Sequence, residues 1–247
     1  MANATAQEIN RLFKQYREFA YIQSDEFIDS FHSDFDRLKK GIGEITREFK
    51  DLERRTAPSF NVFKVLNLAR HENRTHSAFL STLLSPEGKH SQGFLFLKSF
   101  LSYCAKVHPD FPLPDIDHDS GEWEVRTELP ISSTGQGIGD SRLDIVIRSE
   151  ELSYLCVIEN KVDAYEQPGQ IKRYSDWMKL QDREFSTQAL IYLTPMGIEA
   201  MTAIGCVYFR LSYREYIHSW LESILPSIEA SRLKEVIQQY SDLVHNL

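Results

Sequence analysis

The sequence predicts a mixed α/β fold preceded by an N-terminal helical arm. Residues 5–55 are rich in Glu, Lys, Arg, Phe and Leu, and their apolar positions recur at steps of three and four residues, as in an amphipathic helix. Three segments between residues 123 and 162 have strand character, and a helical stretch and two further short strands follow them. This order of elements is typical of a central mixed β-sheet flanked by helices.

Composition restricts the class of protein. The 247 residues, of which 42% are hydrophobic, are enough for a buried core with an appended element. No apolar run approaches the roughly 20 residues of a membrane helix, and the N-terminus lacks the pattern of a signal peptide. The cysteines are far apart and never in CxxC spacing, which favours neither a disulfide framework nor a zinc site. We therefore expect a cytoplasmic protein that has no membrane contact.

The net charge of −8 argues against a surface that is basic all over, as many non-specific nucleic-acid binders have. A local basic groove is compatible with this charge. The basic residues of the N-terminal arm are interleaved with acidic ones, so a solvated helix face is the preferred interpretation over DNA contact.

We predict two regions, an N-terminal helical arm or hairpin at residues 1–57 and a domain at residues 58–247. Gly41 and Gly43 mark a candidate break in the arm, and the helix is expected to end near Pro58. Two interpretations of its apolar stripe stay open. The stripe either packs on the rest of the chain or joins two copies into a homodimer.

After Pro58, apolar positions follow a helical period as far as Pro86. When the inward stripe is continued from Ala69 in steps of three or four, it reaches Glu72, then His76 and Leu80. A carboxylate thus falls on the apolar face of the predicted helix. A turn, a further helix and a loop rich in proline and aspartate come next.

The segments "SRLDIVIRS" and "YLCVIENKV" are apolar on both faces apart from a few charged residues, which indicates a sheet covered on both sides. If the turn between them is centred near Glu151, Asp144 lies opposite Glu159 or Ile158. Glu159 and Lys161 are two residues apart and share a face. A change of register by one residue would move Asp144 to the opposite face.

This register gathers two carboxylates and an amine on an otherwise apolar face, built from Val146, Leu155 and Val157. Two close carboxylates repel each other, and burial raises the cost of both charges. A hard divalent cation such as Mg²⁺ would compensate them, and it suits phosphate chemistry. The alternative interpretation is a structural ion pair on the sheet.

The pattern "RLDIVI" followed by "VIENK" resembles the D…(D/E)xK signature of the PD-(D/E)xK nuclease superfamily, with Leu143 in place of the proline. Gln170 and Tyr174 in "QIKRY" resemble the Gln-xxx-Tyr element of RecB-like exonucleases, and "HENRTHSAFLSTLLSPEGKH" is similar to the opening of a bacterial branch of uncharacterised members. The resemblance covers about Phe60 to Leu211. It implies a restriction-endonuclease-like core.

The resemblance also implies roles for individual residues. Mg²⁺, for which Mn²⁺ can substitute, would be bound by Asp144, Glu159 and the backbone carbonyl of Asn160, with Glu72 binding directly or through water. Lys161 would orient the attacking water and offset charge on the phosphate. In the following helix, Gln170 would orient the metal-bound water or a phosphate. Three further residues of that helix would stack on the nucleic acid or neutralise its charge; these are Lys172, Arg173 and Tyr174.

By this resemblance the chain would be a Mg²⁺-dependent deoxyribonuclease acting in phage defence or DNA processing. The alternatives are a non-catalytic nucleic-acid or protein binding module on the same fold, and a dimeric scaffold. Glu128 competes with Glu72 for the third acidic position, and we favour Glu72 because Glu128 belongs to the wetter face of its strand. His71 and His76 are five residues apart and do not form an HExxH zinc motif, so His76 is expected to be a core histidine.

Overall fold

The computed structural model describes residues 2–116, 121–131 and 141–247. The chain divides into two compact units, residues 1–60 and residues 61–247, and each is described by itself. Among the described residues, no helix is both long enough and apolar enough to cross a membrane.

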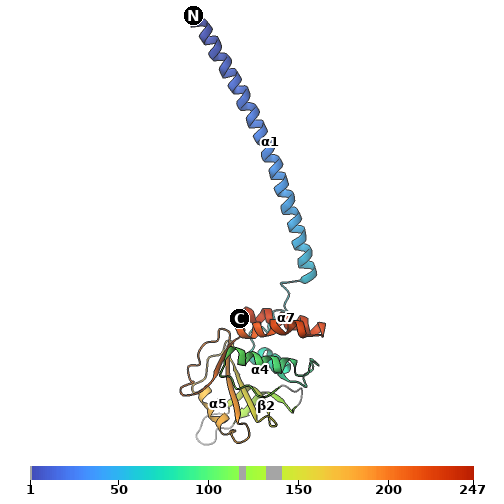
Figure 1. The fold of residues 1–247 in the computed structure, drawn as a ribbon, viewed down its shortest axis with the longest axis vertical. Coiled ribbons are helices and arrows are strands. Elements are labelled where there is room, and N and C mark those ends of the chain that lie inside the picture. The colour runs from blue at the N-terminus through green and yellow to red at the C-terminus, as the bar shows by residue number, and fades with distance from the viewer. Residues whose placement is uncertain (1, 117–120, 132–140) are drawn as a thin grey trace. The chain divides into compact units, whose positions relative to one another are not determined.

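The first unit consists of one continuous helix, α1 (Ala2–Thr56), which has 55 residues (Figure 1). The predicted break at Gly41 and Gly43 is wrong, because neither glycine has a positive φ. Glycine lowers helix stability by about 1 kcal/mol relative to alanine but can keep helical dihedral angles. The helix ends where Ala57 adopts a φ of 41° and Pro58 follows.

The second unit contains a five-stranded mixed sheet with the strand order β1-β2-β3-β4-β5. The strands β1, β2 and β3 pair antiparallel, whereas β3, β4 and β5 pair parallel. The prediction of a mixed sheet is therefore confirmed. The strand bounds are β1 (Glu124–Ile131), β2 (Ser141–Ser149), β3 (Tyr154–Asn160), β4 (Thr187–Thr194) and β5 (Phe209–Ser212).

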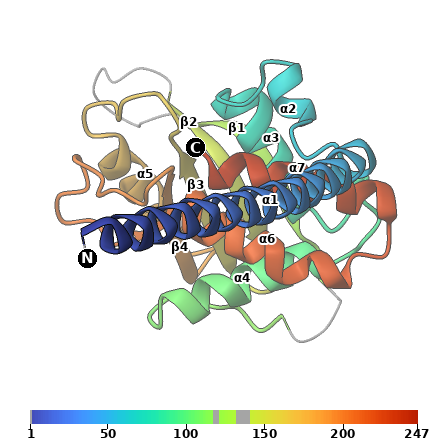
Figure 2. The same cartoon turned by 90° about the horizontal axis from the view of Figure 1, so that it is seen from above.

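Helices cover both faces of this sheet, with α5 on one face and α3, α4, α6 and α7 on the other (Figure 2). Two short π-helical turns and one 3₁₀ turn connect them. The bounds are α2 (Val62–Val65), η1 (Glu72–Ser77), α3 (Ala78–Leu84), α4 (Leu95–Val107), α5 (Gln170–Lys179), η2 (Tyr213–Ile217), α6 (His218–Ile224), η3 (Leu225–Ser227) and α7 (Ser231–His245).

The register between β2 and β3 pairs Ile145 with Ile158 and Val146 with Val157. This is the register that the position of the turn predicted. Over Ile145–Ile147 of β2 and over β3, alternate residues enter different core clusters, so Val146 and Val157 face α5 while Ile145 and Ile158 face the other helices. Burying a large aliphatic side chain contributes about 1.5–3 kcal/mol, which fixes this register against slippage.

The helix predicted from Val62 to Pro86 is interrupted, which corrects the sequence-based expectation. It is divided into α2, η1 and α3, and Asn67 between the first two adopts a φ of 55°. The Oγ1 of Thr75 donates a hydrogen bond to the carbonyl oxygen of Leu68 and holds the connecting segment. Glu72 consequently starts a new π-helical turn, a conformation that is frequent at functional sites.

Candidate active site

Three of the predicted site residues meet at the ends of neighbouring strands. Asp144 lies in β2, Glu159 lies next to the last residue of β3, and Lys161 directly follows that strand. Both carboxylates are buried, Glu159 completely. The Nζ of Lys161 lies 2.5 Å from Oε1 of Glu159, and Oδ2 of Asp144 accepts a 2.8 Å hydrogen bond from the backbone N–H of Asn160.

Gln170 links this group to helix α5. As the first residue of that helix it is 4% exposed, and its Nε2 donates hydrogen bonds to Oε1 of Glu159 at 2.6 Å and to Oη of Tyr174 at 2.9 Å. The spacing of one helical turn places Gln170 and Tyr174 on the same face. Tyr174 in turn donates to the carbonyl oxygen of Arg142 in β2 at 2.6 Å. The helix thereby fixes the orientation of Glu159.

The burial of Tyr174 contradicts the prediction that its ring stacks on nucleic acid, because the side chain is 1% exposed. Lys172 on the same helix pairs with Asp176. Arg173 donates to Ser141 Oγ and to oxygens of the segment before the helix. The sequence pattern located this helix correctly but did not reveal which face it buries.

Glu72 approaches the site from η1. Its Oε1 accepts hydrogen bonds from the backbone N–H groups of Val162, Asp163 and Ala164 at 2.7, 2.9 and 2.8 Å. These are the residues that directly follow Lys161. Glu72 therefore anchors the segment that carries the lysine, a role that no sequence pattern indicates.

Asn160 has a side-chain role that the sequence also did not reveal. Its Nδ2 donates to Oγ of Ser77 at 3.0 Å, and its Oδ1 accepts from Oη of Tyr213 at 2.9 Å. All three side chains are buried. Since an unpaired buried amide is costly, this clamp fixes the end of β3. The partners lie far from Asn160 in the sequence, so no local pattern indicates them.

His76 is a core histidine, as the sequence predicted. Its Nδ1 lies 2.9 Å from Oη of Tyr240 and its Nε2 lies 3.0 Å from the carbonyl oxygen of Ala69. Burial lowers the pKa of His76 to about 4, so the ring is neutral near pH 7.

Burial dominates the electrostatics of the site. It raises the pKa of Glu159 to about 8, with a further contribution from the negative charge of Asp144. Burial likewise raises the pKa of Asp144 to about 6. For Lys161 burial favours the neutral form, but the Glu159 carboxylate outweighs it and the pKa is raised. Oε2 of Glu159 is among the buried oxygens of the described residues that have no hydrogen-bond partner.

This geometry agrees with what a comparison with protein families finds. The family described as the PD-(D/E)XK nuclease superfamily matches residues 60–242. The chain belongs to the PD-(D/E)XK nuclease superfamily. The predicted resemblance is thus confirmed, and it extends through most of α7. Searches of curated proteins and of solved structures find no match.

The donor set fits the divalent cation that the superfamily implies. Oε2 of Glu159, which has no hydrogen-bond partner, and the carboxylate of Asp144 supply the hard oxygen ligands that Mg²⁺ prefers. The one ammonium of Lys161 does not balance the two negative charges of these carboxylates. Within the described ranges, no group of three or more His, Cys, Asp or Glu side chains is placed to hold a metal. A cation here would therefore depend on two carboxylates, a backbone carbonyl and water, as Mg²⁺ accepts.

Glu128 is a further acid near the site. The pairing of Thr127 with Ile145 and of Leu129 with Leu143 places Glu128 beside Asp144 on the adjacent strand. Its backbone has a φ of 54°, and its Oε1 is buried without a hydrogen-bond partner. A strand residue in the left-handed region is strained, and such strain is frequent at functional sites.

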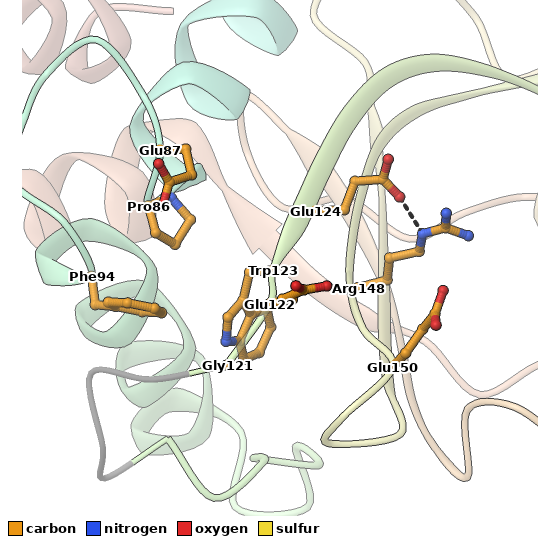
Figure 3. A pocket seen from close by; sticks show the side chains of 9 residues that line it. All are labelled: Pro86, Glu87, Phe94, Gly121, Glu122, Trp123, Glu124, Arg148 and Glu150. Atoms are coloured by element: carbon orange, nitrogen blue, oxygen red, sulfur yellow. Dashed lines mark hydrogen bonds and ion pairs between the residues drawn. The ribbon is translucent and has the colours of Figure 1, made fainter.

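Two cavities lie in different parts of this nuclease-like domain. One of about 230 Å³ is lined by Lys161 and by the segments that follow β3 and β4. A larger one of about 510 Å³ lies at the far end of the β1–β2 pair, where Arg148 points toward Glu124 (Figure 3). None of the predicted site residues lines the larger cavity; its lining residues are Pro86, Glu87, Phe94, Gly121, Glu122, Trp123, Glu124, Arg148 and Glu150.

Proposed function

We propose that this protein is a metal-dependent nuclease that hydrolyses phosphodiester bonds in DNA. The observation that carries the proposal is the fully buried carboxylate oxygen Oε2 of Glu159, which has no hydrogen-bond partner. Its carboxylate interacts electrostatically with Asp144 and Lys161, in a member of a nuclease superfamily. A structural ion pair would leave no such oxygen, because an unpaired buried acceptor is costly.

The proposed cation is Mg²⁺, with Mn²⁺ able to substitute. When bound, it would lower the pKa of a coordinated water and polarise the phosphoryl group. The carboxylates of Asp144 and Glu159 and the carbonyl oxygen of Asn160 would hold it. Glu72 would take part through a water, because three backbone N–H groups already occupy its Oε1.

Lys161 has the position of the water-orienting and charge-offsetting group. Its ammonium lies 2.5 Å from Glu159 and is only partly exposed, so little water screens it from a nearby phosphate. Gln170 donates a hydrogen bond to the same oxygen, Oε1 of Glu159, at 2.6 Å. Both neighbours restrict the carboxylate to one orientation, which favours catalysis because the donors need not reorganise.

The choice of DNA depends on the resemblance of Gln170 and Tyr174 to the RecB-like exonuclease element. We also propose the cytoplasm as the site of action, because Cys104 and Cys156 are buried free thiols. The setting in phage defence or DNA processing is proposed from the resemblance alone.

A cleavage assay tests the function. Wild type, Asp144→Ala and Glu159→Ala are incubated with linear, circular and single-stranded DNA and with RNA, in Mg²⁺, Mn²⁺ or EDTA. We expect metal-dependent cleavage that both variants lose by at least about a hundredfold. Glu229→Ala, an exposed acid outside the site, is the control. Folded proteins that cleave no substrate would instead support the binding-module alternative.

We further infer that α1 joins two copies of the chain. Its apolar residues recur at alternating steps of three and four, the heptad pattern of a coiled coil. All are between 48% and 68% exposed; they are Ile28, Phe31, Phe35, Leu38, Ile42, Ile45, Phe49 and Leu52. Buried phenylalanines contribute about 150–250 Å² each. The stripe is thus large enough for the about 800 Å² per partner that stable interfaces bury.

The oligomeric state tests this inference. Light scattering should give twice the monomer mass for the full chain, and Phe35→Asp should shift it to the monomer. Lys40→Asp changes the charge on the opposite helix face and should leave the dimer intact. A monomeric wild type at micromolar concentration would refute the pairing. The cleavage rate of Phe35→Asp, compared with that of wild type, would show whether pairing matters for catalysis.

A further inference from the structure

An exposed apolar surface borders the proposed active site. The β4–β5 connection, residues 195–208, exposes Met196, Ile198, Met201, Ile204 and Val207. In the segment after β3, Tyr165 is 90% exposed. We call the connection and Tyr165 together the apolar loop. Contiguous exposed apolar groups on a protein indicate a binding surface more often than scattered ones do.

The backbone of the apolar loop is held in place by hydrogen bonds. The N–H of Ile198 donates to Oγ1 of Thr194 at 3.0 Å, and the N–H of Met201 donates to Oε2 of Glu166 at 2.6 Å. Beneath it, small residues pack against the core cluster that contains α5; these are Ala200, Ala203 and Cys206. The exposed side chains are therefore presented from a fixed frame.

Three exposed residues of the apolar loop, Tyr165, Ile198 and Met201, line the same cavity of about 230 Å³ as Lys161. Tyr165, Tyr192, Ile198 and Met201 contribute ring and aliphatic surface to it. Pockets for drug-sized ligands occupy about 300–1,000 Å³, so this one has room for a single flat ring system. Its position beside Lys161 places such a ring next to the phosphate on which the lysine would act.

The acids around this cavity already have partners. Asp163 pairs with Arg70, and Glu199 lies 3.1 Å from Arg210. Glu166 accepts hydrogen bonds from the backbone N–H groups of Met201 and Thr202. A ligand would meet an apolar, partly aromatic wall and the ammonium of Lys161, which also pairs with Glu159. A nucleotide matches this combination, because it carries a phosphate beside a base with two apolar faces.

We propose that this cavity binds one unstacked base of the strand being cut, with Tyr165 stacking on that base. The inference rests on the proposed nuclease function and names its substrate class. A base must leave the duplex stack to enter the cavity. The protein therefore prefers single strands or frayed ends over intact duplex, and it shows little sequence preference because every base has a π-face.

Binding without cleavage tests the subsite. In EDTA and low salt, fluorescence anisotropy compares a single-stranded oligonucleotide with its duplex for wild type, Tyr165→Ala and Met201→Ala. We expect wild type to bind the single strand about tenfold more tightly than the duplex, and both variants to lose about tenfold in affinity for it. Leu180→Ala removes an equally exposed apolar side chain outside the cavity and should bind as wild type does.

Oligonucleotides with one abasic site at each successive position locate the base. Cleavage by wild type in Mg²⁺ should fall at one position relative to the cut, and Tyr165→Ala should lose this sensitivity. Cleavage with no sensitive position, or equal single-strand binding by Tyr165→Ala, overturns the subsite and leaves the nuclease function standing. Absence of cleavage together with Tyr165-dependent binding supports the subsite and overturns the nuclease function instead.

Discussion

The backbone N–H of Asn160 donates to Oδ2 of Asp144 across the β2–β3 pair, so a side-chain carboxylate continues the hydrogen bonding of the two strands at their ends. The Asn160 side chain is held from the other direction by Ser77 and Tyr213. The position of Asp144 is therefore set by the same residue whose carbonyl oxygen we propose as a metal ligand.

Asp144→Asn should separate the structural role of this carboxylate from its charge. The amide oxygen can still accept the hydrogen bond from Asn160, so we expect the fold to persist. Removing the charge should lower the affinity for Mn²⁺ at least about tenfold and abolish cleavage. Calorimetric titration with Mn²⁺ measures the affinity, and unchanged binding would remove Asp144 from the ligand set.

The metal-free protein should become less stable as the pH rises from about 4 to about 8. Asp144 and Glu159 have folded-state pKa values of about 6 and about 8, above their ordinary values of 3.8 and 4.5. In this window the folded state binds more protons than the unfolded state, so the free energy of unfolding falls as the pH rises. At about 1.4 kcal/mol per pKa unit, the loss is on the order of a few kcal/mol.

Urea denaturation in EDTA at pH 5 and pH 8 measures this loss. Added Mg²⁺ should restore stability at pH 8, because a bound ligand stabilises the folded state. Glu159→Gln carries no charge and should show a weaker pH dependence than wild type. A wild-type stability that rises over the same range in EDTA would contradict the assignment of the two buried carboxylates.

Tyr213→Phe should weaken metal binding without contact to the metal. The substitution leaves Oδ1 of Asn160 buried and unpaired, which costs about 1–3 kcal/mol of stability. The Asn160 side chain then keeps its hydrogen bond to Ser77 but loses the one from Tyr213, so the end of β3 is held less firmly. We expect the affinity for Mn²⁺ to fall about threefold to tenfold. Calorimetric titration measures this change.

Tyr240→Phe is the matched control for this prediction. Its hydroxyl is equally buried, lies 2.9 Å from Nδ1 of His76 and interacts with the Tyr213 hydroxyl. It has no hydrogen bond to Asn160, so Tyr240→Phe keeps the hydrogen bond that Tyr213 donates to Asn160. The variant should lose a comparable amount of stability and keep the wild-type affinity for Mn²⁺. Equal losses of affinity in both variants would mean that general destabilisation, not the clamp, causes the effect.

The relation of Asp144 to Glu159 could be predicted because it depends on local information. The turn near Glu151 and the alternation of apolar residues on two adjacent strands determine the register. The register then brings the charged residues together without any knowledge of the rest of the fold.

Other features of the site depend on contacts between distant segments. Oε1 of Glu72 accepts hydrogen bonds from three backbone N–H groups and so joins η1 to the segment after β3. The hydrogen bond from Tyr213 to Asn160 joins η2 to the end of β3. The helical period placed Tyr174 on the helix correctly, but its burial depends on how α5 packs on the sheet. The glycines of α1 predict a break that the structure does not contain, because composition does not reveal backbone dihedral angles.

Glu72→Gln and Glu72→Ala should distinguish a loop anchor from a metal ligand. Glutamine keeps a carbonyl oxygen for the N–H groups of residues 162–164, whereas alanine leaves them without this acceptor. We expect the alanine variant to lose about 1–3 kcal/mol of stability and most activity, and the glutamine variant to retain the greater part of both. An inactive but fully stable Glu72→Gln would show that the charge of Glu72 serves the metal.

Glu128→Gly should stabilise the metal-free protein. Glycine adopts a φ of 54° without the strain that a side chain imposes there, and the substitution removes a negative charge beside Asp144 and a buried oxygen, Oε1, that has no partner. The other oxygen, Oε2, lies 4.0 Å from the exposed guanidinium of Arg142, and so long and exposed an ion pair contributes little stability. We expect a gain of about 1 kcal/mol in urea denaturation with EDTA. Glu124→Gly, on the same strand, should destabilise, because Glu124 pairs with Arg126 and Arg148. A destabilised Glu128→Gly would mean that the carboxylate makes favourable contacts that outweigh the strain.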